Sequence, residues 1–481
     1  MKDAAAIRDP SRPGSQVSGG SASVSRQVRP ATWERMVARS RRLFSPGVRQ
    51  GTISLVDQAI SSGLSFLTTV LIGRFCGPGE LGTYALGFSL VLMAYIVLNA
   101  VVAVPYAVYG NRLHGTPRAE FAGAVLVHNG LLSAAAALAL LGGIVVISSG
   151  LGPPSLVPVL SVLVVTIPFI LLREFARRFC FAHLRAGTAL VLDLSVAVLQ
   201  TGGLLLLVAT GRLSAVTANI LIGLVSAAAG LVWLTLVRRD FVVRWGQIVP
   251  VVRQSWTFGG WVFASGFVSE AASNMLILWL LALIVDERAA GVFAATATIV
   301  RLCNPLVIGV GQLLTPWVAR AYHDAGVRGA QRVVRKASLF LALEMGLFCV
   351  VLFFAGGLIM EVLYGSKYAG YEYLTIIMAL STTAAAVGMG PGAGLWTLER
   401  PDVTFKAHVL GFIAMCAVAL SLPWSVLGAV CSLLAGQVTT CTTQWISFSH
   451  LARRKREEEN ARVEWESVIV PESANTVNVG S

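Results

Sequence analysis

The chain has 481 residues, of which 56% are hydrophobic and only 13% are charged, and its mean hydropathy is +0.74. Because soluble globular domains carry about 25% charged residues, this composition excludes a soluble globular enzyme and a disordered chain. The seven cysteines are scattered and form no CxxC pair, which argues against a disulfide scaffold and a zinc site. We therefore expect a polytopic membrane protein that uses no metal and no cofactor.

Twelve apolar runs are long enough to cross a bilayer, whose hydrocarbon core of about 30 Å requires about 20 helical residues. The runs are 53–73, 83–108, 121–148, 155–175, 187–209, 215–237, 257–284, 291–317, 338–362, 372–395, 405–423 and 427–447. They predict an all-α integral membrane protein with twelve transmembrane helices. Because the number is even, both termini lie on the same side of the membrane.

The distribution of arginine and lysine indicates which side that is. Of the 37 Lys and Arg residues, 32 lie in the terminal segments or near the connections that follow even-numbered runs. Only Arg74, Arg212, Arg288 and Lys367 lie in the opposite connections. This positive-inside pattern predicts a multi-pass protein of the inner (plasma) membrane with both termini in the cytoplasm. The net charge of +13 then reflects topology and does not indicate a nucleic-acid partner.

The chain divides into two halves that resemble each other. The second run opens with the sequence GTYAL at Gly82, and the eighth run opens with GVFAA at Gly291, 209 residues later. Two six-helix bundles are therefore expected, related by a pseudo-two-fold axis along the membrane normal. The predicted segments are a cytoplasmic N-terminal segment at 1–50, bundles at 51–237 and 257–450, a cytoplasmic linker at 238–256 and a cytoplasmic tail at 451–481.

Two local patterns leave alternatives open. Residues 31–46 predict either a short interfacial helix or a basic anchor before the first span, while the rest of the N-terminal segment is predicted to be disordered. Residues 388–394 contain four glycines and Pro391. They predict either a tenth helix that bends or unwinds, or helices that pack closely through small residues.

Five ionisable residues lie inside the apolar runs, where a charge costs at least about 2.5–3.5 kcal/mol. They are Asp57, Asp193, Glu270, Arg301 and Glu344. Asp57, Asp193 and Glu344 lie five to seven residues from the inner ends of their runs. For these three, hydrogen bonding at the inner leaflet and ion coupling are both open.

Glu270 and Arg301 reach the middle of the membrane on neighbouring helices. They are interpreted either as a substrate-binding pair, with Glu270 as an alternative carrier of a proton or a sodium ion, or as a permanent structural ion pair. Because a guanidinium binds phosphate oxygens in a bidentate manner, Arg301 suits a pyrophosphate group. Asn274 lies one turn from Glu270 and would add a polar contact.

Two further sets of arginines have alternative interpretations. Arg74, at the outer end of the first run, either reaches the lipid headgroups or contacts substrate at the outer mouth. A cluster of arginines near the connection after the fourth run either determines the membrane topology or binds an anionic lipid headgroup. Its members are Arg173, Arg177, Arg178 and Arg185.

Motifs of hydrolytic enzymes do not occur in the sequence. It contains neither a GxxxxGK[ST] phosphate loop nor an HExxH motif, and the predicted outer loops have at most nine residues. We therefore do not expect an enzyme.

Three segments resemble a known family. The segment from Ile72 to Leu86 resembles the helix 1–2 junction of polysaccharide flippases, which belong to the multidrug/oligosaccharidyl-lipid/polysaccharide exporter (MOP) superfamily. Residues 172–187 are similar to that family's helix 4–5 connection, and residues 394–406 resemble the corresponding place in the second half. The resemblance covers residues 50–450, approximately.

This resemblance implies a two-lobe transporter that moves an undecaprenyl-pyrophosphate-linked oligosaccharide or polysaccharide precursor to the outer leaflet by alternating access. Such transport would serve lipopolysaccharide, O-antigen or exopolysaccharide export. The implied partners are the lipid-linked oligosaccharide, membrane lipids, a glycan polymerase and other polysaccharide assembly proteins. Basic cavity residues hold the headgroup in such proteins, and Arg301 is the best match.

Other functions are also open. A cation- or proton-coupled multidrug exporter of the same superfamily would use acidic cavity residues, for which Asp57, Asp193, Glu270 and Glu344 are available. A lipid II flippase would carry more spans or a more arginine-rich cavity. A non-transporting membrane scaffold would not need five buried charges.

Overall fold

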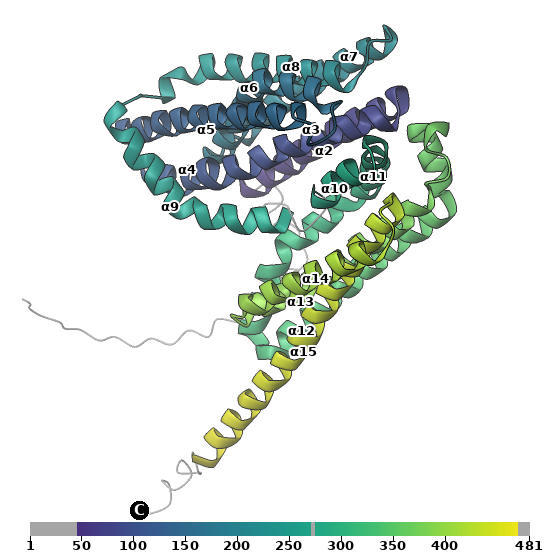
Figure 1. The fold of residues 1–481 in the computed structure, drawn as a ribbon. Coiled ribbons are helices and arrows are strands. Elements are labelled where there is room, and N and C mark those ends of the chain that lie inside the picture. Colours follow the sequence, from purple (N-terminus) through teal and green to yellow (C-terminus); the bar gives the residue numbers. More distant parts are fainter. Residues whose placement is uncertain (1–45, 271–274, 470–481) are drawn as a thin grey trace, which may run out of the picture. The chain divides into compact units, whose positions relative to one another are not determined.

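A computed structural model describes residues 46–270 and 275–469, and every regular element in these ranges is a helix (Figure 1). The predicted all-α fold is therefore confirmed. Apart from Pro46, the segment 31–46 lies outside the described residues.

The first half contains six long helices and one short helix. They are α2 (Pro46–Cys76), α3 (Pro78–Leu98), α4 (Val104–Tyr109), α5 (Thr116–Ser148), α6 (Leu156–Ala182), α7 (Ala186–Ala209) and α8 (Ala215–Val237). A π-helical turn, η1 (Asn99–Ala103), joins α3 to α4 just before Pro105, which lacks the N–H of a regular helix. Glycines with positive φ, Gly77 and Gly115, allow the sharp turns that precede α3 and α5.

The second half contains the remaining helices. They are α9 (Trp245–Glu270), α10 (Leu276–Ile284), α11 (Glu287–Val300), α12 (Asn304–Tyr364), α13 (Tyr373–Thr397), α14 (Pro401–Ser421) and α15 (Val426–Ile469). A 3₁₀ turn, η5 (Arg301–Cys303), separates α11 from α12. Apart from residues 271–274, which the structure does not describe, and a few residues at run ends, all twelve predicted runs lie on helices.

The helices differ from the predicted runs in the second half. The eighth run, 291–317, is interrupted by η5, because Pro305 cannot donate the backbone hydrogen bond of a continuous helix. The connection to the ninth run is itself helical, with a kink at Ala325 and Gly326, where Gly326 has φ 59°. Ten helices in the described ranges are long and apolar enough to span a membrane, and the one within α12 contains the end of the eighth run and all of the ninth.

The predicted linker and tail also contain helix. The linker at 238–256 contributes the first three turns of α9. The tail forms the last part of α15, whose Glu459 carboxylate accepts a hydrogen bond from the Val327 backbone N–H at 3.4 Å, beside the kink in α12.

The glycine-rich stretch at 388–394 lies inside a continuous helix, α13, so the prediction of an unwound tenth helix is wrong. The alternative, close packing through small residues, is confirmed. A Cβ atom at Gly390 would lie 2.0 Å from the Ser338 hydroxyl oxygen, and one at Gly394 would lie 2.4 Å from the Phe448 ring. Neighbouring helices therefore fill the space that larger side chains would need.

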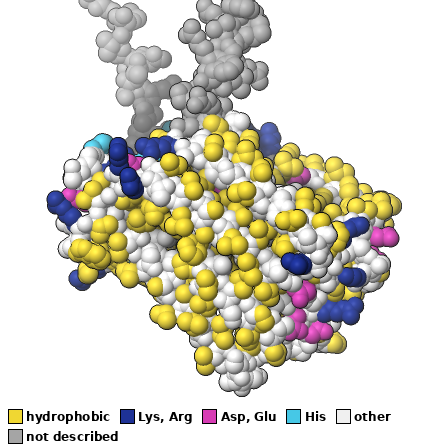
Figure 2. Space-filling model, turned by 90° about the horizontal axis from the view of Figure 1, so that it is seen from above, with side chains coloured by type: hydrophobic (Ala, Val, Ile, Leu, Met, Phe, Trp, Pro, Cys, Tyr) yellow, Lys and Arg dark blue, Asp and Glu magenta, His cyan; other side chains and the backbone are white. Residues whose placement is uncertain are grey.

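Large hydrophobic side chains cover much of the surface. Figure 2 shows one face that is mainly hydrophobic or uncharged, with charged side chains gathered toward its edges. Phe354, Leu420 and Leu236 are 82%, 80% and 78% exposed. Soluble proteins rarely expose such extensive apolar surface, whereas lipid chains cover it favourably.

The two halves meet where α3 crosses α11, and the contact is reciprocal. A Cβ atom at Gly82 would lie 1.8 Å from the Glu287 carbonyl oxygen, and one at Gly291 would lie 1.7 Å from the Pro78 carbonyl oxygen. Each glycine thus faces the residue four positions before the other glycine, as a two-fold axis requires. The two glycines that open the predicted repeat therefore meet at the pseudo-two-fold.

Candidate functional site

A cavity lies between helices of both halves, next to the crossing of α3 and α11. Its walls come from α2, α3, α10 and α11 and are largely apolar, with Tyr84 and Phe293 among them. The polar side chains in its lining are Ser65, Thr69, Tyr84, Ser89, Thr298 and Arg301. The cavity therefore combines an apolar wall with a few hydroxyl groups and one cation.

Arg301 is the charged residue among the described side chains that line this cavity. It begins η5, directly after the C-terminal end of α11, and it is exposed. The negative end of a helix dipole favours a cation at this position. The break before Pro305 thus places a guanidinium at the cavity instead of continuing the helix.

Hydrogen bonds fix part of the cavity wall. The Trp279 indole N–H donates to the Ser89 hydroxyl at 2.9 Å, which joins α10 to α3. The Thr298 hydroxyl donates to the Ala294 carbonyl within α11 at 2.7 Å. These bonds use polar groups that would otherwise remain unpaired in an apolar wall.

Two predicted site residues cannot be placed at the cavity. Glu270 is the last residue of α9, but its side chain lies outside the described part of the chain, as does all of Asn274. Met275, the next described residue, lines the cavity. The pairing of Glu270 with Arg301 stays a prediction.

Arg74 joins the two halves at the end that carries few arginines. Its guanidinium donates to the Val362 carbonyl near the C-terminal end of α12. Beside it, a Cβ atom at Gly73 would lie 2.5 Å from the ring of Tyr364, which is fully buried. Substrate contact by Arg74 stays a prediction.

A second charged group, the buried ion cluster, lies inside the first half and contains Asp57, Arg177 and Asp193. The Arg177 guanidinium donates to Asp57 Oδ2 at 2.7 Å through Nη2 and to Asp193 Oδ2 at 2.7 Å through Nε. The Arg177 side chain is 12% exposed, and those of Asp57 and Asp193 are 0% and 2% exposed. One arginine on α6 therefore joins carboxylates on α2 and α7.

Additional charges surround the buried ion cluster. Glu174, also buried, accepts a hydrogen bond from Arg178 Nε at 2.7 Å and lies 3.8 Å from Arg177 Nη1. The second carboxylate oxygens of Asp57 and Asp193 have no hydrogen-bond partner among the described atoms. The sequence identified Asp57, Arg177 and Asp193 separately, but it did not predict their association.

Glu344, on α12, is in a different environment. Both of its carboxyl oxygens are buried and have no hydrogen-bond partner in the described part of the protein. Leu341 and Met345, on either side of Glu344, pack with Cys303 of η5 in one apolar cluster. Glu344 therefore lies beside the break in the eighth span that also positions Arg301.

Comparison with known proteins identifies the family. A family model described as "Polysaccharide biosynthesis protein" matches residues 116–373, which is more than half of the chain. The chain belongs to this family. No curated protein sequence matches it. The matched region extends from α5 to the start of α13 and thus includes parts of both halves.

Solved structures of MATE transporters and of a lipid II flippase share the fold of this family member. An inward-facing multidrug resistance MATE family transporter has TM-score 0.67 and 14% identity, with 82% of this chain and 95% of that chain covered. The lipid II flippase MurJ, in an inward closed conformation, has TM-score 0.67 and 11% identity, with 84% and 90% covered. The MATE transporter VcmN of Vibrio cholerae, in a bent form, has TM-score 0.53 and 16% identity, with 85% and 96% covered.

These similarities confirm the predicted fold, which has twelve spans in two six-helix bundles. Together with the ten long apolar helices, they identify the family member as a multi-pass membrane protein.

Proposed function

We propose that the protein moves an undecaprenyl-pyrophosphate-linked oligosaccharide or polysaccharide precursor from the cytoplasmic to the outer leaflet. The observation that carries this proposal is the cavity cation Arg301, placed between the two halves of a chain from a polysaccharide biosynthesis family. Its planar fork of N–H donors matches the oxygens of a diphosphate.

The contacts between the halves support alternating access as the mechanism. The helices α3 and α11 touch through glycines at the arginine-poor end, where Arg74 also reaches α12. We assign this end to the outer side of the inner membrane, because the arginine-rich connections and both termini are expected in the cytoplasm. Separation of the halves at this contact would open the cavity toward the outer leaflet.

Multidrug export is less well supported by the cavity. A cationic drug would favour an acidic lining, and no described residue that lines the cavity is acidic. Asp57 and Asp193 are paired with Arg177 instead. We therefore assign these two carboxylates a structural role in the first bundle.

If the protein moves a lipid-linked precursor, we expect a glycan polymerase and other assembly proteins to receive the translocated product.

Transport by the purified protein tests the proposal. Proteoliposomes that contain the full chain are loaded with a fluorescent prenyl-pyrophosphoryl oligosaccharide in one leaflet and, in a parallel experiment, with a cationic dye. We expect translocation of the lipid and no transport of the dye. Dye transport without lipid translocation would overturn the proposal in favour of multidrug export.

We assign coupling to a proton at Glu344, because both of its carboxyl oxygens are buried and have no hydrogen-bond partner among the described residues. A hard cation would need several oxygen ligands, whereas a proton needs one carboxylate. Replacement of Glu344 by Gln, which mimics the protonated form, should remove the stimulation of translocation by an imposed proton gradient. The measurement compares lipid translocation with and without the gradient.

The matched control for this prediction is Glu361→Gln, because Glu361 is an exposed carboxylate on the same helix. It should keep the stimulation seen in the wild-type protein. Gradient stimulation that persists in Glu344→Gln would assign coupling to another group.

A further inference from the structure

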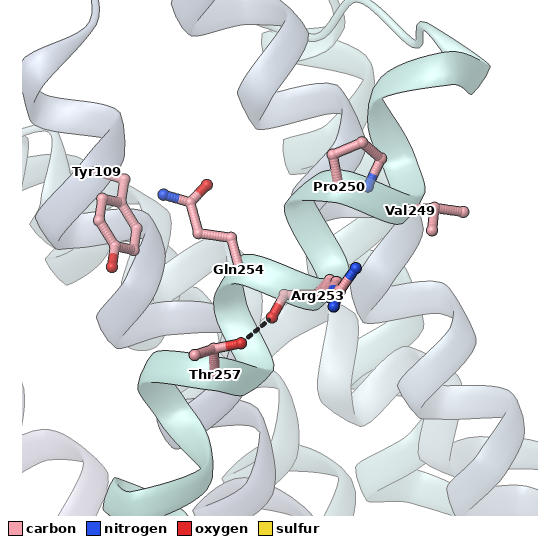
Figure 3. A pocket seen from close by; sticks show the side chains of 6 residues that line it. All are labelled: Tyr109, Val249, Pro250, Arg253, Gln254 and Thr257. Carbon is pink, nitrogen blue, oxygen red and sulfur yellow. Dashed lines mark hydrogen bonds between the residues drawn. The ribbon is translucent and has the colours of Figure 1, made fainter.

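A second pocket lies at the arginine-rich end of the protein, between α4 and α9. It is lined by Tyr109, Val249, Pro250, Arg253, Gln254 and Thr257, has a volume of about 710 Å³ and is open to the outside. Figure 3 shows Tyr109 of α4 across from Gln254 and Thr257 of α9. This volume is within the range of about 300–1,000 Å³ that small-molecule sites occupy. It shares no lining residue with the cavity that contains Arg301.

The pocket follows from the way α9 crosses the first half. A Cβ atom at Gly259 would lie 2.2 Å from the Ala100 carbonyl oxygen, so α9 and η1 touch through their backbones. On the arginine-rich side of this contact, α4 carries Tyr109 and α9 carries Arg253. The pocket lies between these two helices.

The lining is suited to an anion that accepts several hydrogen bonds. Arg253 provides a planar set of N–H donors, and Tyr109 and Gln254 provide a hydroxyl and an amide. The Thr257 hydroxyl donates to the Arg253 carbonyl at 2.9 Å, which holds the local turn of α9. No acidic side chain occurs among the described residues of the lining, so nothing there opposes a diphosphate.

The surroundings of the pocket favour a lipid over a free phosphate. Trp245, Val249 and Trp256 on α9 are 78%, 74% and 44% exposed. Exposed tryptophans beside an arginine are typical of the level of the lipid headgroups. A lipid whose headgroup enters the pocket would keep its chain in the bilayer.

We propose that this pocket is the loading site for the diphosphate headgroup of a lipid-linked substrate. The inference rests on the proposed function and adds a binding step before transfer to Arg301. Arg253 lies 17 residues before Glu270, the last residue of α9, which corresponds to roughly 25 Å along the helix. The substrate would therefore bind Arg253 first and reach the mid-membrane cavity afterwards.

Binding and translocation are measured separately to test this inference. The full chain in nanodiscs binds a radiolabelled prenyl diphosphate, with prenyl monophosphate, inorganic pyrophosphate and phosphatidylglycerol as competitors. Arg253→Gln should weaken binding about tenfold and raise the KM of translocation by a similar factor, because a charge-assisted bidentate contact is lost. The kcat should change less than about twofold, since the later step is unaffected.

Two variants serve as controls. Arg239→Gln removes an exposed arginine outside the pocket and should bind like the wild-type protein. Arg253→Lys keeps the charge without the planar fork and should give an intermediate affinity. Thermal unfolding of each variant verifies that it is folded.

The possible outcomes separate this inference from the proposed function. Wild-type affinity in Arg253→Gln would overturn the loading site, even if the wild-type protein translocates lipid. Equal competition by inorganic pyrophosphate or phosphatidylglycerol would also overturn it. Loss of binding in Arg253→Gln together with no translocation by the wild-type protein would support the binding site and reject the proposed transport.

Discussion

Replacement of Arg177 by Gln is expected to lower the free energy of unfolding by about 3–5 kcal/mol, because it removes the cation that two buried carboxylates share. Asp57 and Asp193 are almost completely buried, and each accepts a 2.7 Å hydrogen bond from Arg177. These carboxylates belong to α2 and α7, while Arg177 belongs to α6. Loss of the Arg177 side chain should therefore affect the packing of three helices. The lower stability is measured as a lower midpoint of thermal unfolding in detergent.

The control for this prediction is Arg185→Gln. Arg185 is 53% exposed and forms a 3.4 Å pair with Asp240, which is 39% exposed, so its removal should have little effect. A triple variant, Arg177→Gln with Asp57→Asn and Asp193→Asn, should recover part of the lost stability, because none of its three replaced side chains carries a buried charge. An Arg177→Gln protein as stable as the wild type would show that the buried ion cluster does not stabilise the first bundle.

Replacement of Gly82 by Ala is expected to reduce translocation about tenfold or more, because overpacking costs about 1–3 kcal/mol and each 1.4 kcal/mol is a factor of ten. The added methyl group would lie 1.8 Å from the Glu287 carbonyl oxygen and 2.9 Å from the Gly291 backbone nitrogen. Both are backbone atoms, so α3 and α11 would have to move apart. The arginine-poor end would then close poorly, and the rate of lipid translocation measures the effect.

A matched variant on the same helix tests whether the position matters. A Cβ atom at Gly79 would have no heavy atom within 4 Å, so Gly79→Ala should translocate like the wild-type protein. Gly291→Ala should resemble Gly82→Ala, because the contact is reciprocal. Normal translocation by Gly82→Ala would mean that this crossing does not need to close during transport.

The spans could be predicted from the sequence because hydropathy depends on residues that are adjacent in the chain. The two glycines of the repeat, Gly82 and Gly291, were also recognised by their similar surroundings. Their direct contact was not predicted, because a repeat indicates equivalent positions and does not reveal which equivalent positions lie on the symmetry axis.

The charged sites were harder to predict. Asp57 and Arg177 are 120 residues apart in the chain, so no local sequence pattern indicates that they pair. One signal was present, since Asp57 and Asp193 lie at similar depth and Arg177 follows Glu174 by three residues. Arg253 falls in the predicted linker at 238–256, where an arginine indicates topology alone, and the sequence analysis does not predict the helical start of α9.

The central claim is that Arg301 holds the diphosphate of the lipid-linked substrate in the cavity between the halves. The measurement is translocation of a fluorescent prenyl-pyrophosphoryl oligosaccharide in proteoliposomes that contain the wild-type, Arg301→Gln or Arg212→Gln protein. Thermal unfolding verifies that each protein is folded. We predict that Arg301→Gln lowers the rate at least about tenfold, since a charge-assisted contact is lost, while Arg212→Gln, at the exposed turn after α7, does not. Equal translocation by the wild-type and Arg301→Gln proteins would contradict the account.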